Sequence, residues 1–140
     1  MRFMVLLKAD KNTEAGVLPS EELLTAMNKY NEELVKAGVL VDGAGLQASS
    51  RGARVRFSGA KRTVTDGPFT DGKDLIAGYW MFQVKSKEEA IEWVKRCPNP
   101  HDGEAEIEIR QVFEIEDFPN ARAEVREFEE QQRRPRTGWK

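Results

Sequence analysis

Residues 75–84 read LIAGYWMFQV, and this stretch decides which fold the chain can adopt. Trp80 and Phe82 lie on one parity of the stretch, and Met81 lies on the other. Successive side chains of a β-strand point to opposite faces of the sheet, so this strand is apolar on both faces. Residues 2–9 (RFMVLLKA) have the same character. Short apolar runs of this kind are typical of strands covered on both faces, so we expect two central strands.

Two amphipathic helices are predicted around these strands. Ser20 caps the first helix, whose apolar residues recur at helical spacing, and Gly38 ends it. Ser86 begins the second helix and forms a capping box with Glu89, while Pro98 ends it. Both helices are expected to bury one apolar stripe against the sheet.

The remaining strands complete an α+β pattern. Strand character is found in residues 39–46, in the alternating arms of a β-hairpin within 53–65, and in 105–115. This order predicts a ferredoxin-like βαββαβ domain with an inserted hairpin. We place this domain at residues 1–118, followed by a C-terminal helical extension and basic tail at 119–140.

The second face of the predicted sheet has consequences for assembly. In the ferredoxin-like arrangement both helices cover one face, which leaves the other face open. An apolar sheet face of that size is not expected on a monomer. A second copy is the simplest cover, and twofold dimers are the commonest closed assembly, so we expect a homodimer.

The composition narrows the class of protein. The chain has 140 residues, a formal net charge of −2 and one cysteine, Cys97. The near-neutral balance gives no broad electrostatic footprint for nucleic acid, and one cysteine excludes an intrachain disulfide. The N-terminal apolar run is too short to cross a membrane. We expect a cytoplasmic protein without a nucleic-acid or membrane partner.

Several motifs together resemble one family. The sequence resembles the DGPF branch of the YCII-related proteins over roughly residues 1–118. The motifs that carry the resemblance are DGPF at 66–69, LIAGYW at 75–80, Glu89-Ala90 with Trp93, and Arg96-Cys97-Pro98.

The resemblance implies a dimeric α/β barrel of largely unassigned activity. Related proteins carry a His–Asp pair proposed as catalytic, and one relative is linked to dehydrochlorination of an aromatic compound. Genes of the DGPF branch often lie beside those for extracytoplasmic-function sigma factors. This chain departs from the family pattern because its first strand and first helix contain no histidine.

Two residues are candidates for catalysis. Asp66 ends the predicted hairpin, where its carboxylate could act as a general base, or it could only stabilise the Asp-Gly-Pro turn. His101 is the only histidine, and with Asp102 it could form a proton-transfer pair. The alternative for His101 is a solvent-exposed residue in a Pro- and Gly-rich loop, which is the interpretation we favour.

Three residues are candidates for substrate binding. Tyr79, Glu108 and Arg110 occupy polar parities of two strands and would converge inside the barrel if those strands are neighbours. Arg110 could bind a substrate carboxylate. The alternative is a structural ion pair between Arg110 and Glu108 or Asp66, which we favour.

The sequence predicts no metal site and no cofactor. It lacks the phosphate-binding, dinucleotide-binding and zinc-protease motifs, and Cys97 lies on an apolar helix stripe, as an unreactive buried thiol does. Two functions remain open. One is a small-molecule enzyme or binding protein with its pocket in the barrel. The other is a non-catalytic interaction module, linked to a sigma factor through residues 119–140.

Overall fold

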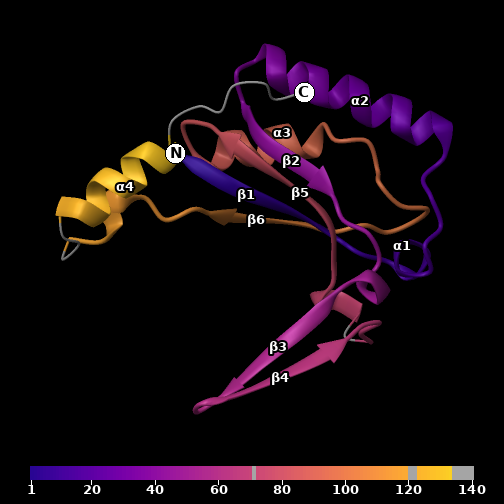
Figure 1. The fold of residues 1–140 in the computed structure, drawn as a ribbon. Coiled ribbons are helices and arrows are strands. Elements are labelled where there is room, and N and C mark those ends of the chain that lie inside the picture. Colours follow the sequence, from indigo (N-terminus) through magenta and orange to yellow (C-terminus); the bar gives the residue numbers. More distant parts are fainter. Residues whose placement is uncertain (71, 120–122, 134–140) are drawn as a thin grey trace.

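The computed structural model describes residues 1–70, 72–119 and 123–133. Its centre is a four-stranded antiparallel sheet with the strand order β2-β5-β1-β6 (Figure 1). The strands are β1 (Arg2–Lys8), β2 (Leu40–Gly45), β5 (Ile76–Gln83) and β6 (Ile107–Gln111). The two strands that are apolar on both faces, β1 and β5, are the central ones, as the sequence predicts.

Two helices cover one face of this sheet. They are α2 (Glu21–Lys36) and α3 (Lys87–Lys95), capped by Ser20 and Ser86 as expected (Figure 1). Glu89 differs in detail, because its carboxylate accepts the amide of Lys85 and not that of the serine. The arrangement is a mixed α+β fold consistent with the ferredoxin-like class.

The core lies between the helices and the sheet. Phe3 and Val5 of β1 and Phe82 of β5 are buried against Leu34 of α2 and Ala90 of α3. Burying a large apolar side chain of this kind contributes about 1.5–3 kcal/mol. Strand β5 also carries a polar anchor, in which the Trp80 indole donates a 2.9 Å hydrogen bond to the Asn31 side-chain oxygen.

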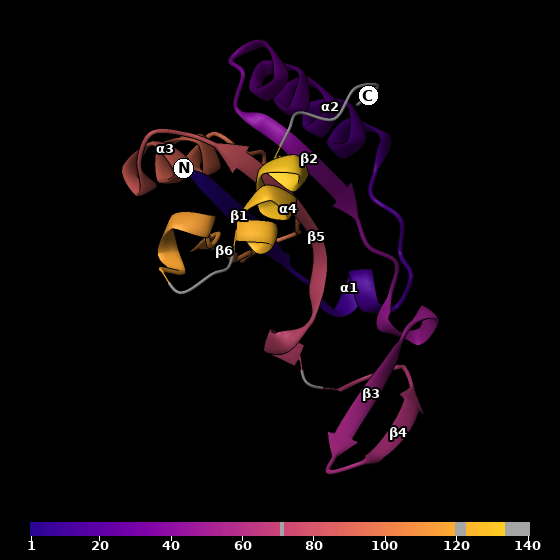
Figure 2. The ribbon, with the colours of Figure 1, turned by 60° about the vertical axis from the view of Figure 1, so that its left-hand side comes forward.

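A β-hairpin stands away from the sheet. Its strands are β3 (Ala53–Ser58) and β4 (Lys61–Asp66), which pair only with each other, and every residue in both strands is exposed (Figures 1 and 2). The hairpin is inserted between β2 and β5, as predicted. Its apolar side chains Val55, Phe57 and Val64 lie in solvent in the single chain.

The connections after β1 and β6 both contain short helical turns. After β1, Asp10 and Thr13 form a capping box that begins the short helix α1 (Lys11–Glu14). The last strand ends at Gln111 and not at residue 115. Beyond it, Glu114 forms an ion pair with Arg2 and a reciprocal cap with Asp117, which begins the 3-10 turn η3 (Ile115–Asp117).

The sheet face opposite the helices is uncovered within the described residues. Met4, Leu6 and Met81 lie half-buried on it, and the sheet of one chain does not close into a barrel. Helix α4 (Ala123–Arg133) lies within the segment where we expect the helical extension, and its apolar residues Val125 and Phe128 are exposed. The predicted basic tail lies outside the described residues. No helix in the described ranges has both the length and the apolarity needed to cross a bilayer.

Candidate ligand-binding cleft

A large cleft opens on the helix-covered side of the sheet, with a volume of about 1200 Å³. We call it the α2 cleft, because one wall is the N-terminal half of α2 with Leu23, Leu24 and Met27. The opposite wall is formed by β2 and β5, including Leu40 and Trp80. Three loops complete it: residues 16–20, 46–51 and 99–102. Pockets that bind small molecules are typically apolar clefts with a few polar groups.

Exposed apolar side chains gather around the α2 cleft. Val17, Leu18, Leu24 and Leu46 are 57%, 85%, 55% and 49% exposed, and all four line it. Isolated apolar residues on a surface are ordinary, but a contiguous group indicates a binding surface. A bound apolar molecule at the rim of this cleft would therefore remove exposed apolar surface from water.

His101 lines the α2 cleft. Its Nε2 is 2.8 Å from the Lys8 carbonyl oxygen, and its Nδ1 is 3.3 Å from Oδ2 of Asp10. The side chain is only 4% exposed. The expectation of a solvent-exposed loop histidine was therefore wrong. Its carboxylate partner is Asp10 and not the adjacent Asp102, because the loop folds back onto the end of β1.

Both ring nitrogens of His101 face hydrogen-bond acceptors. A backbone carbonyl only accepts, so Nε2 carries a proton and donates it to Lys8. The Asp10 carboxylate also only accepts, so it can take a hydrogen bond from Nδ1 when that nitrogen carries a proton. This geometry gives His101 a positioning role, in which it ties the 99–102 loop to the end of β1. The chain thus contains a His–Asp pair, assembled from segments at opposite ends of the domain.

The environment of Asp10 favours its ionised form. The backbone amide of Thr13 donates to the carboxylate at 2.8 Å and is the main cause of a lowered pKa for Asp10. Partial burial acts in the opposite direction, and the positive charge of His101 lowers the pKa of Asp10 further. A carboxylate stabilised in this way is a negatively charged partner for the His101 ring.

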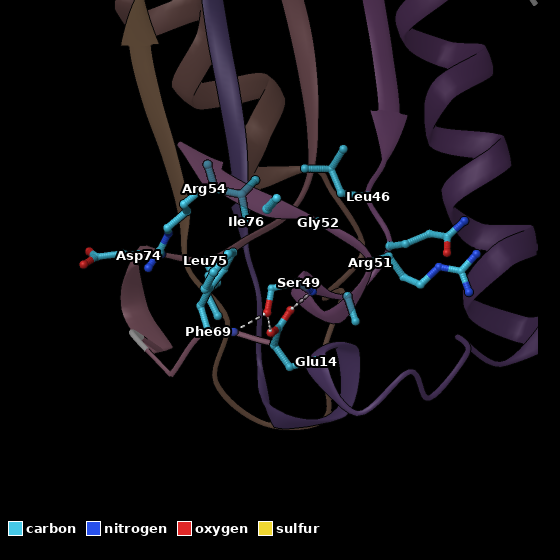
Figure 3. Close-up of a pocket in the computed structure, with 13 residues that line it drawn as sticks. Glu14, Leu46, Ser49, Arg51, Gly52, Arg54, Phe69, Asp74, Leu75 and Ile76 are labelled. Carbon is cyan, nitrogen blue, oxygen red and sulfur yellow. Dashed lines mark hydrogen bonds between the residues drawn. The ribbon is translucent and has the colours of Figure 1, made fainter. Parts of the chain in front are cut away.

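Arg51 provides a cation at the α2 cleft. It ends the 3-10 turn η1 (Ser49–Arg51), and it lines the cleft. Figure 3 shows its side chain extending from this turn away from Phe69 and toward the side on which α2 lies. Within the described part of the chain, its guanidinium forms no hydrogen bond or ion pair.

A second, smaller cavity of about 430 Å³ adjoins the α2 cleft and shares Leu46 and Arg51 with it (Figure 3). Here the Ser49 hydroxyl donates to Glu14 and accepts the amide of Phe69 at 2.9 Å. Gly67 fits closely beside it, because a Cβ at this position would lie 1.8 Å from the Ser49 carbonyl oxygen. Residues 66–69 of the DGPF motif thus pack against η1, which is a structural role.

Comparison with known proteins decides the family. The YCII-related domain matches residues 1–116, which is most of the chain. The chain belongs to the YCII-related family. An uncharacterized protein of Rhizobium meliloti (strain 1021), R00369, is 26% identical over 114 residues, which cover 80% of this chain and 92% of that protein. These matches identify the family without distinguishing its DGPF branch.

Asp66 of this YCII-related protein lies away from both cavities. It is the last residue of β4, is exposed, and lines neither the α2 cleft nor the smaller cavity. Its Cα partner in the hairpin is Ala53. The structure therefore does not bring Asp66 together with His101 or with the three candidates for substrate binding.

The three candidates for substrate binding lie on the sheet face opposite the helices, which we call the outer sheet face. Tyr79 and Glu108 both lie opposite Leu6 of β1, one on each neighbouring strand. The expected ion pair between Arg110 and Glu108 is confirmed at 3.2 Å. Arg110 and Lys8 lower the pKa of Glu108, chiefly through their hydrogen bonds.

These candidates contribute little to the α2 cleft of the YCII-related protein. Glu108 and Arg110 lie outside it. Tyr79 borders the cleft because β5 forms one of its walls, but the Tyr79 hydroxyl donates to Asp42 at 3.4 Å. Asp42 pairs with Met81 in the sheet and so shares the outer face. The polar group of Tyr79 is therefore directed away from the cleft.

Cys97 has the environment of an unreactive thiol. It follows the C-terminal end of α3, is partly buried, and packs against the core. Burial raises the pKa of Cys97 to about 11. A thiol with a raised pKa is mostly protonated at neutral pH and a poor nucleophile. No cluster of three or more potential metal ligands occurs among the residues that the structure describes.

The residues that sequence reasoning missed are Asp10, Asn31 and Arg51. Asp10 had a local signal, since Asp-x-x-Thr is a helix-capping pattern. Asn31 and Arg51 had none, because an asparagine on a helix and an arginine in a polar loop are ordinary. Their importance in this YCII-related protein follows only from their position at the α2 cleft.

Proposed function

We propose that this YCII-related protein binds a small molecule with an apolar body in the α2 cleft. The observation that carries the proposal is the gathering of exposed apolar side chains around one cleft that also contains His101 and Asn31. Each Å² of apolar surface removed from water contributes about 25 cal/mol. A ligand that covers Leu18, Leu24 and Leu46 would gain this energy, while the polar groups would fix its orientation.

The cleft is tested with N-phenyl-1-naphthylamine, an uncharged probe whose fluorescence rises in apolar surroundings. We expect saturable binding to the wild-type protein. Leu24→Gln should weaken it about tenfold, because the substitution removes roughly one apolar side chain from the binding surface. Leu24 is 55% exposed, so this change leaves the core intact.

Val35→Gln is the matched control for Leu24→Gln. Val35 lies on the same helix, is 52% exposed, and is not part of the α2 cleft. Its substitution should leave the affinity unchanged. Absence of binding, or equal effects of the two substitutions, would contradict a ligand site in the cleft.

We also propose that two copies associate through the outer sheet face and so form the dimeric α/β barrel. This face holds the half-buried Met4, Leu6 and Met81, flanked by the acid Glu108 and the base Arg110. A surface with apolar residues and both signs of charge can pair with itself about a twofold axis. The helices already cover the other face, so the α2 cleft would stay open in such a dimer.

A further inference from the structure

The charge balance at the α2 cleft depends on Arg51. Other arginines of the chain have carboxylate partners: Arg2 pairs with Glu114, Arg96 with Glu33 and Arg110 with Glu108. Arg51 has no carboxylate partner among the described residues. The acid Glu14 of helix α1 instead binds Ser49 with both of its oxygens. A fork of N–H donors at the wall of an apolar cleft is suited to bind an oxyanion.

The remaining charged groups at the cleft limit the charge of that oxyanion. Asp10 is paired with His101, and Asp102 contributes one negative charge. Among the residues that the structure describes, Arg51 is then the single unpaired cation at the cleft, and no second arginine or lysine lines it. A monoanion is matched one to one by Arg51, whereas a phosphate dianion would keep a second negative charge uncompensated in a cleft that already holds Asp102.

From this arrangement we infer that the ligand of the α2 cleft is an amphipathic carboxylate. Its head group binds the guanidinium of Arg51, and its apolar body lies among Leu24, Leu46 and Met27. The planar carboxylate can accept two parallel hydrogen bonds from the guanidinium, which fixes the direction in which the ligand enters. The inference rests on the ligand site proposed above and adds the chemical class of its occupant.

The test compares two probes that differ in one group. 8-Anilinonaphthalene-1-sulfonate is N-phenyl-1-naphthylamine with an added sulfonate, which here stands in for the carboxylate. A hydrogen bond to a charged group contributes about 1.5–3 kcal/mol, which corresponds to about 10–100-fold in affinity. We expect the sulfonate probe to bind at least tenfold more tightly than the uncharged probe.

Substitution of Arg51 tests whether this side chain causes the difference in affinity between the two probes. Arg51→Gln should reduce the affinity for the sulfonate probe to that for the uncharged probe and leave the uncharged probe unaffected. The matched control is Arg56→Gln, because Arg56 is an exposed arginine of the hairpin that lies outside both cavities. This control should change neither affinity.

Competition then separates the possible head groups. 1-Naphthoate should displace the sulfonate probe more effectively than 1-naphthyl phosphate. Stronger displacement by the phosphate, or equal binding of the two probes with no effect of Arg51→Gln, would overturn the inference while the ligand site itself stands. Failure of the uncharged probe to bind the wild-type protein would instead refute the proposed function.

Discussion

Gly67 packs directly against the backbone of Ser49. A Cβ there would lie 1.8 Å from the Ser49 carbonyl oxygen, which is part of a rigid turn and cannot rotate away as a flexible side chain can. Gly67→Ala must therefore displace residues 66–69 from η1. We expect the free energy of unfolding in urea to fall by about 1–3 kcal/mol, as for other overpacked sites.

Gly45→Ala is the control for this measurement. A Cβ at Gly45 meets no atom within 4 Å, and Gly45 lies in a strand without a positive φ. Its stability should stay within about 0.5 kcal/mol of wild type or rise slightly. Equal stabilities of the Gly67 variant and wild type would show that the contact with Ser49 can relax.

The lowered pKa of Asp10 predicts that the stability of the folded protein depends on pH. The pKa of Asp10 is lowered from the ordinary value of 3.8, so its carboxylate stabilises the folded state fully above that value. This contribution is lost as the pH falls from 3.8 through the lowered pKa. Asp10→Asn keeps an acceptor for the Thr13 amide but removes the charge facing His101. We expect a lower melting temperature for this variant at about pH 6, and a difference from wild type that closes in the acid range below 3.8.

Asp102→Asn controls for the loss of a charge near His101. Asp102 is exposed and adjacent in sequence, but the histidine pairs with Asp10. Calorimetry at intervals from about pH 6 into the acid range should show no comparable difference in melting temperature between Asp102→Asn and wild type. If the melting temperature of Asp10→Asn stayed equally far below that of wild type in acid, the negative charge of Asp10 could not be the cause of the difference.

At the scale of elements, the hairpin β3–β4 is independent of the sheet that carries it. Its two ends meet where the Gly67 amide donates a 3.0 Å hydrogen bond to the Gly52 carbonyl, and its own residues are exposed. Replacement of residues 53–66 by Gly-Gly should therefore leave a folded domain. This replacement removes the stacking of the Arg54 guanidinium on the Phe69 ring, whose centroid lies 3.9 Å away.

The expected result of this deletion is cooperative unfolding with a melting temperature within a few degrees of wild type. An isolated two-stranded hairpin is only marginally stable, so it contributes little to a sheet it does not touch. Circular dichroism melts provide the measurement. A variant without a cooperative transition would show that the hairpin supports the fold.

At the scale of the molecule, the open sheet face predicts a dimer. The chain has a mass of 15.9 kDa, and we expect a solution mass of about twice that value by light scattering. Met81→Lys places a charge at the centre of the outer face, opposite Met4 of β1, and should give a monomer. Because the α2 cleft lies on the other side, this monomer should still bind the uncharged probe.

Thr25→Lys is the control, since it adds the same charge on the exposed side of α2. It should leave the dimer intact. A wild-type protein that is monomeric at micromolar concentration would contradict the proposed assembly and the barrel with it.

Local patterns in the sequence determined the elements of this protein. The serine caps at residues 20 and 86, the alternation in residues 53–65 and the apolar runs of β1 and β5 each depend on neighbours in the chain. Such signals predicted both main helices, the hairpin and the central strands. They failed where a tertiary contact ends an element, as Glu114 does with Arg2 after β6.

The site was decided by tertiary structure. His101 was singled out because it is the only histidine, but its partner Asp10 and the burial of its ring follow from a loop that folds back onto β1. Arg51 had no signal at all, since only the folded chain places it at the α2 cleft. Secondary structure is encoded by neighbours along the chain, whereas a cleft is formed by residues that are brought together only when the core packs.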